Sequence, residues 1–151
     1  MSLSSGIEIS EGVTFYLMNG GQVRLYVLRT FSSRAIDHWI DHVVSGLAEC
    51  PSICGYRVIY DLSGISLFAL KAFRTYAIGS LGMSSSGQAR VRAILGEKSQ
   101  IRVNLAILTH PTLSAWVLKK SNGNQIDVPF KFFLSLDRAS AWLVNGNGDH
   151  A

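Results

Sequence analysis

The chain has 151 residues, of which 48% are hydrophobic and only 16% are charged. This composition is typical of a compact domain with a substantial apolar core, and it excludes an intrinsically disordered chain. Clean apolar runs such as Leu105-Ala106-Ile107-Leu108 are only a few residues long, far short of the roughly 20 residues of a membrane-spanning helix.

The N-terminus and the cysteines both indicate a cytoplasmic protein. Residues 1–11 contain two glutamates and lack the basic-then-apolar pattern of a signal peptide, so we expect a flexible N-terminus. Cys50 and Cys54 are separated by three residues, whereas a redox motif has two, and the further soft ligands of a zinc site are missing. We therefore expect reduced thiols and no metal.

An antiparallel hairpin is predicted near the start of the chain. Two strand-like segments, 13–18 and 23–30, flank Asn19-Gly20-Gly21-Gln22. Asparagine and glycine readily adopt the positive φ angles that a tight hairpin turn requires.

An amphipathic helix is predicted over residues 33–49, where apolar residues recur at helical spacing, and Pro51 follows its end. The predicted polar face carries His38 and His42, four residues apart, with Asp41 beside them. Such a pair could chelate a metal ion, but an exposed helix face often has this composition and no third ligand is evident. We therefore interpret it as a solvated face.

Strands and helices alternate over the rest of the chain. A β-branched segment ending at Tyr60 predicts a buried central strand, and 88–97 fits either a short strand or, by its composition, a helix. We expect Asp137 to cap the last helix, in which Ala141 and Trp142 point inward. The other predicted elements are helices over 67–81, 110–120 and 137–144 and strands over 101–108 and 129–134.

This order of elements predicts an α/β fold (α+β mixed sheet). We expect a mixed sheet of about five strands that begins with the antiparallel hairpin and is covered by helices. The absence of a repeat or linker predicts one domain over residues 12–145, followed by a flexible tail over 146–151. We expect Tyr16, Tyr26 and Tyr56 at the sheet surface and edges.

The central strand continues into Tyr60-Asp61-Leu62-Ser63-Gly64-Ile65, at the strand end where α/β folds usually place functional residues. Together with the hairpin and the first helix, this motif resembles the STAS domain. Two features of the C-terminal half add to the resemblance: the proline-started helix after Leu108 and the segment Ala139-Ser140-Ala141-Trp142-Leu143. The closer likeness, over roughly residues 12–145, is to its bacterial SpoIIAA-like branch, whose fold is similar to the CRAL-TRIO lipid-binding domains. The resemblance implies a non-enzymatic protein-interaction or regulatory module in bacterial cytosolic signalling. The alternative that it implies is a small-molecule or lipid-binding domain of CRAL-TRIO-like type.

One departure from the STAS pattern concerns phosphorylation. STAS antagonists that are switched by a kinase carry an acceptor serine a few residues past this motif, where the present chain has Leu70. Leucine has no hydroxyl, so the usual phospho-switch is not implied. We interpret Ser63 and Ser66 as caps rather than phosphorylation sites, and Asp61 as a turn former rather than a catalytic base.

Enzyme motifs are missing from the sequence. It contains no Gly-x-Ser-x-Gly elbow, no Gly-x-Gly-x-x-Gly fingerprint and no Walker loop, and His110 has no evident partner. We therefore expect neither catalysis nor a bound cofactor.

The basic residues are concentrated in one part of the chain. Residues 62–126 carry eight Lys or Arg against Glu97 alone, a charge of +7, within a total of +4. Such a charge predicts attraction of an acidic protein partner or an anionic ligand, while no nucleic-acid-binding motif accompanies it. A homodimer is also compatible with the sequence. The predicted partner or ligand surface combines the central motif and the basic segment: Asp61, Ser63, Gly64, Ser66, Phe68, Arg90, Arg92 and Lys98.

Overall fold

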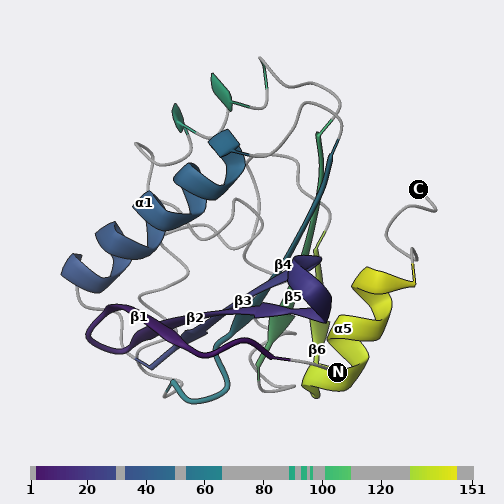
Figure 1. Ribbon diagram of the computed structural model, residues 1–151. Coiled ribbons are helices and arrows are strands. Elements are labelled where there is room, and N and C mark those ends of the chain that lie inside the picture. Colours follow the sequence, from purple (N-terminus) through teal and green to yellow (C-terminus); the bar gives the residue numbers. More distant parts are fainter. Residues whose placement is uncertain are drawn as a thin grey trace, which may run out of the picture.

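The computed structural model describes residues 3–29, 33–49, 54–65, 89–90, 93–94, 96, 101–109 and 130–145. These residues form a six-stranded sheet with a long helix against one face and a shorter helix against the other (Figure 1). The elements are, in chain order, β1 (Ile7–Ser10), β2 (Val13–Met18), the 3-10 turn η1 (Asn19–Gly21), β3 (Val23–Leu28), α1 (Ser33–Glu49), β4 (Cys54–Asp61), β5 (Ile101–Leu108), β6 (Phe130–Phe133) and α5 (Leu136–Val144).

The strands lie in the sheet in the order of the chain, from β1 to β6. β1, β2 and β3 pair antiparallel, whereas β3, β4, β5 and β6 pair parallel. The predicted α/β fold, a mixed sheet that begins with an antiparallel hairpin, is therefore confirmed. The parallel pairing places the carboxyl ends of β3 to β6 at one edge of the sheet and their amino ends at the opposite edge. Within the described part of the chain, no helix is long and apolar enough to cross a membrane.

The N-terminus differs from the sequence-based expectation of a flexible segment through residue 11. Residues Ile7–Ser10 form β1, which pairs with β2 and makes the sheet six-stranded rather than about five-stranded. Ile9 packs against the core below α1, and this contact anchors the strand. Alternation of Ile7 and Ile9 with Glu8 was a sequence signal for this strand, but a segment of four residues is short for recognition.

The predicted hairpin is confirmed, with Val13 opposite Leu28 and Met18 opposite Val23. The turn between the two strands uses left-handed backbone angles, with φ of 52° at Asn19, 68° at Gly20 and 89° at Gly21. Glycine adopts such angles without the steric cost of a Cβ atom, so the Asn-Gly-Gly sequence determines where the chain reverses.

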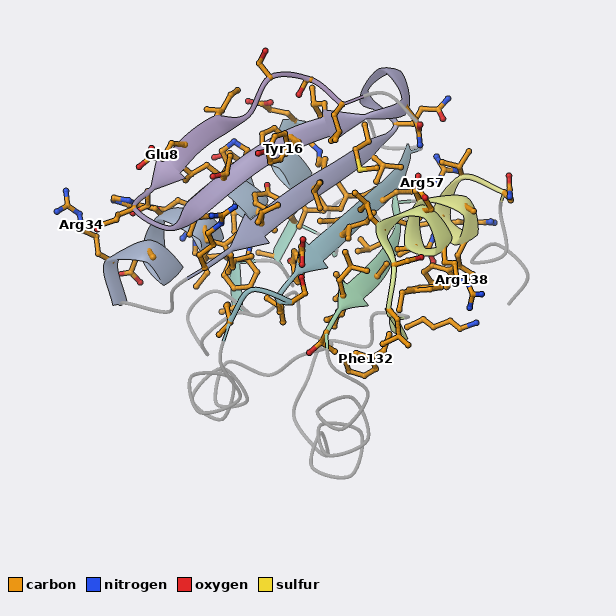
Figure 2. The ribbon with its side chains drawn as sticks, turned by 90° about the horizontal axis from the view of Figure 1, so that it is seen from below. Glu8, Tyr16, Arg34, Arg57, Phe132 and Arg138 are labelled. Atoms are coloured by element: carbon orange, nitrogen blue, oxygen red, sulfur yellow. The ribbon has the colours of Figure 1, made fainter. Side chains whose placement is uncertain are left out.

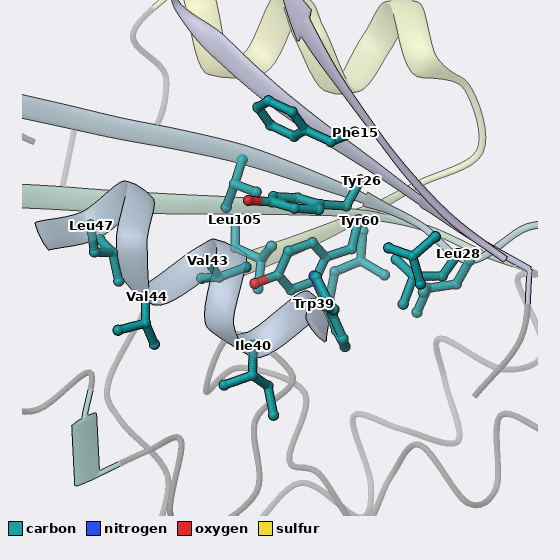
Figure 3. Packing of buried hydrophobic residues seen from close by; sticks show 14 of the residues in the cluster. Phe15, Tyr26, Leu28, Trp39, Ile40, Val43, Val44, Leu47, Tyr60 and Leu105 are labelled. Atoms are coloured by element: carbon teal, nitrogen blue, oxygen red, sulfur yellow. The ribbon is translucent and has the colours of Figure 1, made fainter. Parts of the chain in front are cut away.

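α1 covers one face of the sheet, and the largest buried side chains lie between them (Figure 3). Trp39 of α1 meets Tyr60 of β4 edge-on, with ring centroids 4.8 Å apart, and Tyr60 in turn meets Tyr26 of β3 at 6.0 Å. Both tyrosines are almost fully buried, so the expectation that Tyr26 lies at the sheet surface is wrong. An aromatic ring buries more apolar area than most other side chains, and this layer dominates the α1 side of the core.

α5 covers part of the opposite face through Ala139, Ser140 and Leu143, which are buried. Trp142 is half-buried and packs against this part of the core, as predicted, whereas Ala141 is exposed, so the expectation that it points inward is wrong. Its cap also differs from the expectation.

Ser135, not Asp137, is the N-cap of α5, and its hydroxyl accepts a hydrogen bond from the backbone N–H of Arg138 at 3.2 Å. Asp137 instead lies in the first turn, where a carboxylate is stabilised by the positive end of the helix dipole. The hydroxyl of Ser140, on the buried face of α5, has its hydrogen-bond partner in the hairpin turn. The side-chain amide of Asn19 donates to it at 2.9 Å.

Between 88 and 97, the described residues are helical, which agrees with the composition-based preference for a helix there. The helices predicted over 67–81 and 110–120 and the tail predicted over 146–151 lie outside the described residues.

A pair of identical substitutions tests the assignment of the core. Leu47 of α1 is fully buried in the core between this helix and the sheet, whereas Leu134 is 72% exposed. We expect Leu47→Ala to lower the free energy of unfolding by about 2–5 kcal/mol, since it removes buried methyl groups and leaves a cavity. Leu134→Ala should change it by about 0.5 kcal/mol or less. Urea denaturation followed by tryptophan fluorescence measures both, and equal losses would contradict this core.

Candidate functional site

The central motif forms a tight turn at the carboxyl end of β4. Oδ1 of Asp61 accepts a hydrogen bond from the backbone N–H of Ser63 at 3.0 Å and another from its hydroxyl at 2.6 Å. Asp61 thus forms the turn, as its sequence context predicted. The turn continues with a hydrogen bond from the N–H of Ile65 to the carbonyl oxygen of Leu62 at 3.1 Å.

Two buried side chains attach this turn to the core. Leu62 and Ile65 pack into the α1 side of the core, and the N–H of Leu62 donates to the carbonyl oxygen of Leu108 at 2.9 Å. Between them, Ser63 and Gly64 are exposed. A Cβ atom added to Gly64 would meet no atom within 4 Å, so the outer side of the turn is open. The result is a rigid turn that presents its tip to solvent.

Thr109 is a further polar residue at this edge that the sequence analysis missed. It follows β5 directly and is 95% buried, while its hydroxyl has no hydrogen-bond partner within the described part of the chain. Its backbone N–H donates to the carbonyl oxygen of Phe133 in β6. A buried hydroxyl without a hydrogen-bond partner destabilises a fold, so we regard Thr109, next to the turn, as a candidate functional residue. Threonine after an apolar strand is common, which left no distinguishing sequence signal.

The basic members of the predicted surface are only partly described. Arg90 donates to the Oδ1 atom of Asp41 on α1 at 2.9 Å in an exposed salt bridge, so it joins the outer face of that helix. Ser66, Phe68, Arg92 and Lys98 lie outside the described residues. The structure thus places Asp61, Ser63 and Gly64 together in one turn.

His42 does not lie on a solvated helix face as expected. Its ring is 4.5 Å from the Phe15 ring and 5.5 Å from the Tyr26 ring, so it faces the sheet. Its Nδ1 atom and the Tyr26 hydroxyl form a hydrogen bond of 2.7 Å. Burial, followed by the positive charge of Arg24, lowers the pKa of His42 below its ordinary value and favours the neutral ring in this hydrogen bond.

Tyr56, also expected near the surface, is 97% buried beside the same group of rings. The Arg24 guanidinium lies 5.3 Å from the Tyr56 ring centroid and 5.8 Å from that of Phe15, within the range of a cation–π interaction. Burial raises the pKa of Tyr56 to about 12 and keeps its hydroxyl protonated. This cluster is the polar part of the interface between α1 and the sheet.

A metal centre is not found in the part of the chain that the structure describes. There, no group of three His, Cys, Asp or Glu side chains gathers in a metal-binding arrangement. Cys50 lies outside the described residues, so the structure does not test the prediction of reduced thiols.

In comparisons with known proteins, the chain matches no family model, no curated protein and no solved structure.

The buried His42 predicts a pH dependence of stability. Its pKa is lowered in the folded chain, so the unfolded chain binds more protons below the ordinary value of 6.5. The stabilisation is therefore complete above that pH and is lost as the pH falls through it. We expect His42→Gln, which removes this titration, to lose less free energy of unfolding than the wild type between about pH 7.5 and about pH 5.5.

His38→Gln is the matched control for this measurement, since it makes the same change one turn earlier in α1 and retains His42. Urea denaturation at each pH gives the free energies. An identical pH dependence in His42→Gln and the wild type would show that His42 does not titrate against the fold.

The exposed ion pair predicts a small loss of stability on substitution, which a second substitution should reverse. Because the side chains of Arg90 and Asp41 are 46% and 62% exposed, solvent screens their attraction, and Arg90→Glu should cost about 0.2–1 kcal/mol of stability. The double variant Asp41→Arg/Arg90→Glu should recover most of this loss by restoring an ion pair of reversed polarity. A thermodynamic cycle of the four proteins measures the coupling, and additive effects would show that the pair contributes nothing.

Proposed function

We propose that the chain is a non-enzymatic interaction or regulatory module of the SpoIIAA/STAS-like type, acting in bacterial cytosolic signalling. We propose further that it recognises its partner through the turn formed by residues 61–65. The observation that carries this proposal is the exposure of Ser63 and Gly64 at the carboxyl end of a buried parallel strand, on a turn held by Asp61. Loops at this end of parallel strands are the usual recognition positions in α/β folds.

The hydrogen bonding of Ser63 supports binding rather than catalysis. Its hydroxyl donates to the same carboxylate oxygen, Oδ1 of Asp61, that receives its backbone N–H. Both bonds close the turn. An activated serine nucleophile instead needs a general base that takes up its proton, most often an imidazole held by a third group.

The charge of the chain supports an acidic partner or an anionic ligand. Residues 62–126 begin inside the turn and carry a charge of +7. Arg90 contributes less to this attraction than the sequence suggested, because Asp41 lies 2.9 Å from it. We retain Ser66, Phe68, Arg92 and Lys98 as proposed members of the surface from their sequence positions. With leucine at position 70, we propose that regulation does not use the phosphate acceptor of the kinase-switched antagonists.

One observation favours the alternative, a small-molecule or lipid-binding domain of the CRAL-TRIO kind. The Thr109 hydroxyl at the same edge is buried and has no partner within the described part of the chain, as expected where a polar atom of a ligand would bind. Native mass spectrometry of the purified protein tests this alternative, since a co-purified small molecule or lipid would appear as a fixed mass increment.

Two substitutions to glutamate test the turn as a recognition surface. Gly64 and Ala141 are both exposed, but Ala141 lies on α5, so Gly64→Glu and Ala141→Glu change the net charge equally at different places. We expect both variants to fold, and we expect Gly64→Glu alone to lose the partner in affinity capture from a bacterial lysate at low salt. If Gly64→Glu and Ala141→Glu capture the same proteins as the wild type, the turn is not the interface.

A further inference from the structure

Two arginines and an asparagine meet at the amino ends of β4 and β5, at the other end of β4 from the turn of residues 61–65. The strand register places Arg102 directly opposite Gly55 and Asn104 directly opposite Arg57. Residues two apart in a strand point to the same side, so these four positions form one patch on a single face. It is the face that α5 partly covers, because Ile59 and Ala106 of the same rows pack against α5 residues.

Gly55 is what allows Arg57 to lie across this patch. A Cβ atom built on Gly55 would meet the guanidinium of Arg57 at 3.5–3.6 Å, so the guanidinium lies over the glycine and beside the backbone of Arg102. Figure 2 shows Arg57 next to α5 and apart from Arg138, which projects elsewhere from that helix. Gly55 and Arg102 are exposed, so the patch is open to solvent.

The polar groups of the patch are incompletely satisfied. The Nε atom of Arg57 is buried and has no hydrogen-bond partner, and Arg57 forms no salt bridge with another described residue. Asn104, directly opposite Arg57, is 95% buried. Folding does not explain the buried Nε atom of Arg57, because a polar atom that is buried without a hydrogen bond destabilises the native state.

We propose that Arg57, Arg102 and Asn104 form a binding site for an oxyanion, the phosphate or carboxylate group of a ligand, above Gly55. All three side chains supply N–H donors, and the two guanidinium groups add positive charge on adjacent strands. Charge-assisted hydrogen bonds from guanidinium groups to oxyanions are among the strongest that proteins form.

This site is separate from the surface of the proposed function. Arg57 and Asp61 lie four residues apart in β4, roughly 13 Å at the rise of a β-strand. The buried Ile59 lies between them on the same face. Loss of one site therefore leaves the other measurable.

Phosphate binding to the full chain tests the proposal. Inorganic phosphate is titrated at constant ionic strength, with sodium chloride as the balancing salt, and the amide resonances of Gly55 and Arg102 are followed by NMR. We expect saturable shifts and a phosphate-dependent rise in melting temperature. Arg57→Gln and Asn104→Leu should each weaken phosphate binding by about tenfold or more, the loss expected for a hydrogen bond to a charged group.

Stability without phosphate separates a binding role from a structural one. Because the buried Nε atom of Arg57 has no partner within the described part of the chain, we expect Arg57→Gln not to lower the melting temperature in phosphate-free buffer. Arg29→Gln is the matched control, since it removes one exposed positive charge just after β3 and should leave phosphate binding unchanged. If Arg57→Gln or Asn104→Leu lowers the melting temperature in phosphate-free buffer while binding phosphate as tightly as the wild type, the residue is structural and the proposal fails.

A resident carboxylate provides a second, independent test. Gly55→Asp places an anion beside the Arg57 guanidinium, at a position where a side chain makes only ordinary contacts. It should raise the melting temperature in phosphate-free buffer and abolish the phosphate response. Gly64→Asp makes the same change at the open turn and should do neither.

Acetate, titrated in the same way, distinguishes the two sources of the oxyanion. Saturation by phosphate alone assigns a phosphate-bearing ligand, and comparable saturation by acetate assigns a carboxylate. If sodium chloride produces the same shifts as phosphate, or if Arg57→Gln binds phosphate as the wild type does, the patch is not an anion site.

Discussion

The packing of α1 against the aromatic side chains of β3 and β4 is the contact on which the rest of the structure depends. β4 lies inside the sheet with parallel partners on both sides, so both of its faces must be covered by other elements. On one face Trp39, Tyr60 and Tyr26 form a continuous series of edge-on ring contacts that is shielded from solvent. Because α1 lies between β3 and β4 in the chain, this single contact also sets the parallel pairing of the two strands. The packing of α1 against the sheet also positions the turn of residues 61–65, since Leu62 and Ile65 are part of the same core.

Buried tyrosine and histidine side chains need hydrogen-bond partners for their polar atoms, whereas leucine and valine do not. A buried hydroxyl or imidazole destabilises the fold unless it is hydrogen-bonded, and the Tyr26–His42 pair meets this requirement within the α1 interface. The interface therefore depends on a histidine that stays neutral. The Tyr56 hydroxyl on the α1 side and the Nε atom of Arg57 at the amino end of β4 are buried polar atoms for which the described part of the chain supplies no partner.

Local patterns in the sequence were sufficient for most of the architecture. The Asn-Gly-Gly turn, the helical period before Pro51 and the β-branched segments are short-range signals. β2, α1 and β5 have the bounds that these signals predicted, and β3 ends two residues earlier than predicted, at Leu28. The errors concern side-chain direction. His42 belongs to the buried face of α1 because that face is wider than its apolar stripe, and Tyr56 is buried although its hydroxyl suggested an edge position. The proximity of Arg57, Arg102 and Asn104 depends on the register between two strands that are about 40 residues apart, which composition and periodicity do not encode.

The rigidity of β4 has a consequence for how the two ends of the strand work together. β4 pairs with β5 at every residue from Cys54 to Asp61 and with β3 over its carboxyl-terminal part, from Arg57 onward. Coupling between binding sites requires an element with two discrete arrangements, each favoured by one ligand. From Arg57 onward β4 is held by hydrogen bonds on both sides, and a second arrangement of this part would break the core. An anion at Arg57 and a partner at Ser63 should therefore bind with independent free energies. The two proposed recognition surfaces would then lie in fixed relation, so that occupation of the first does not change the second.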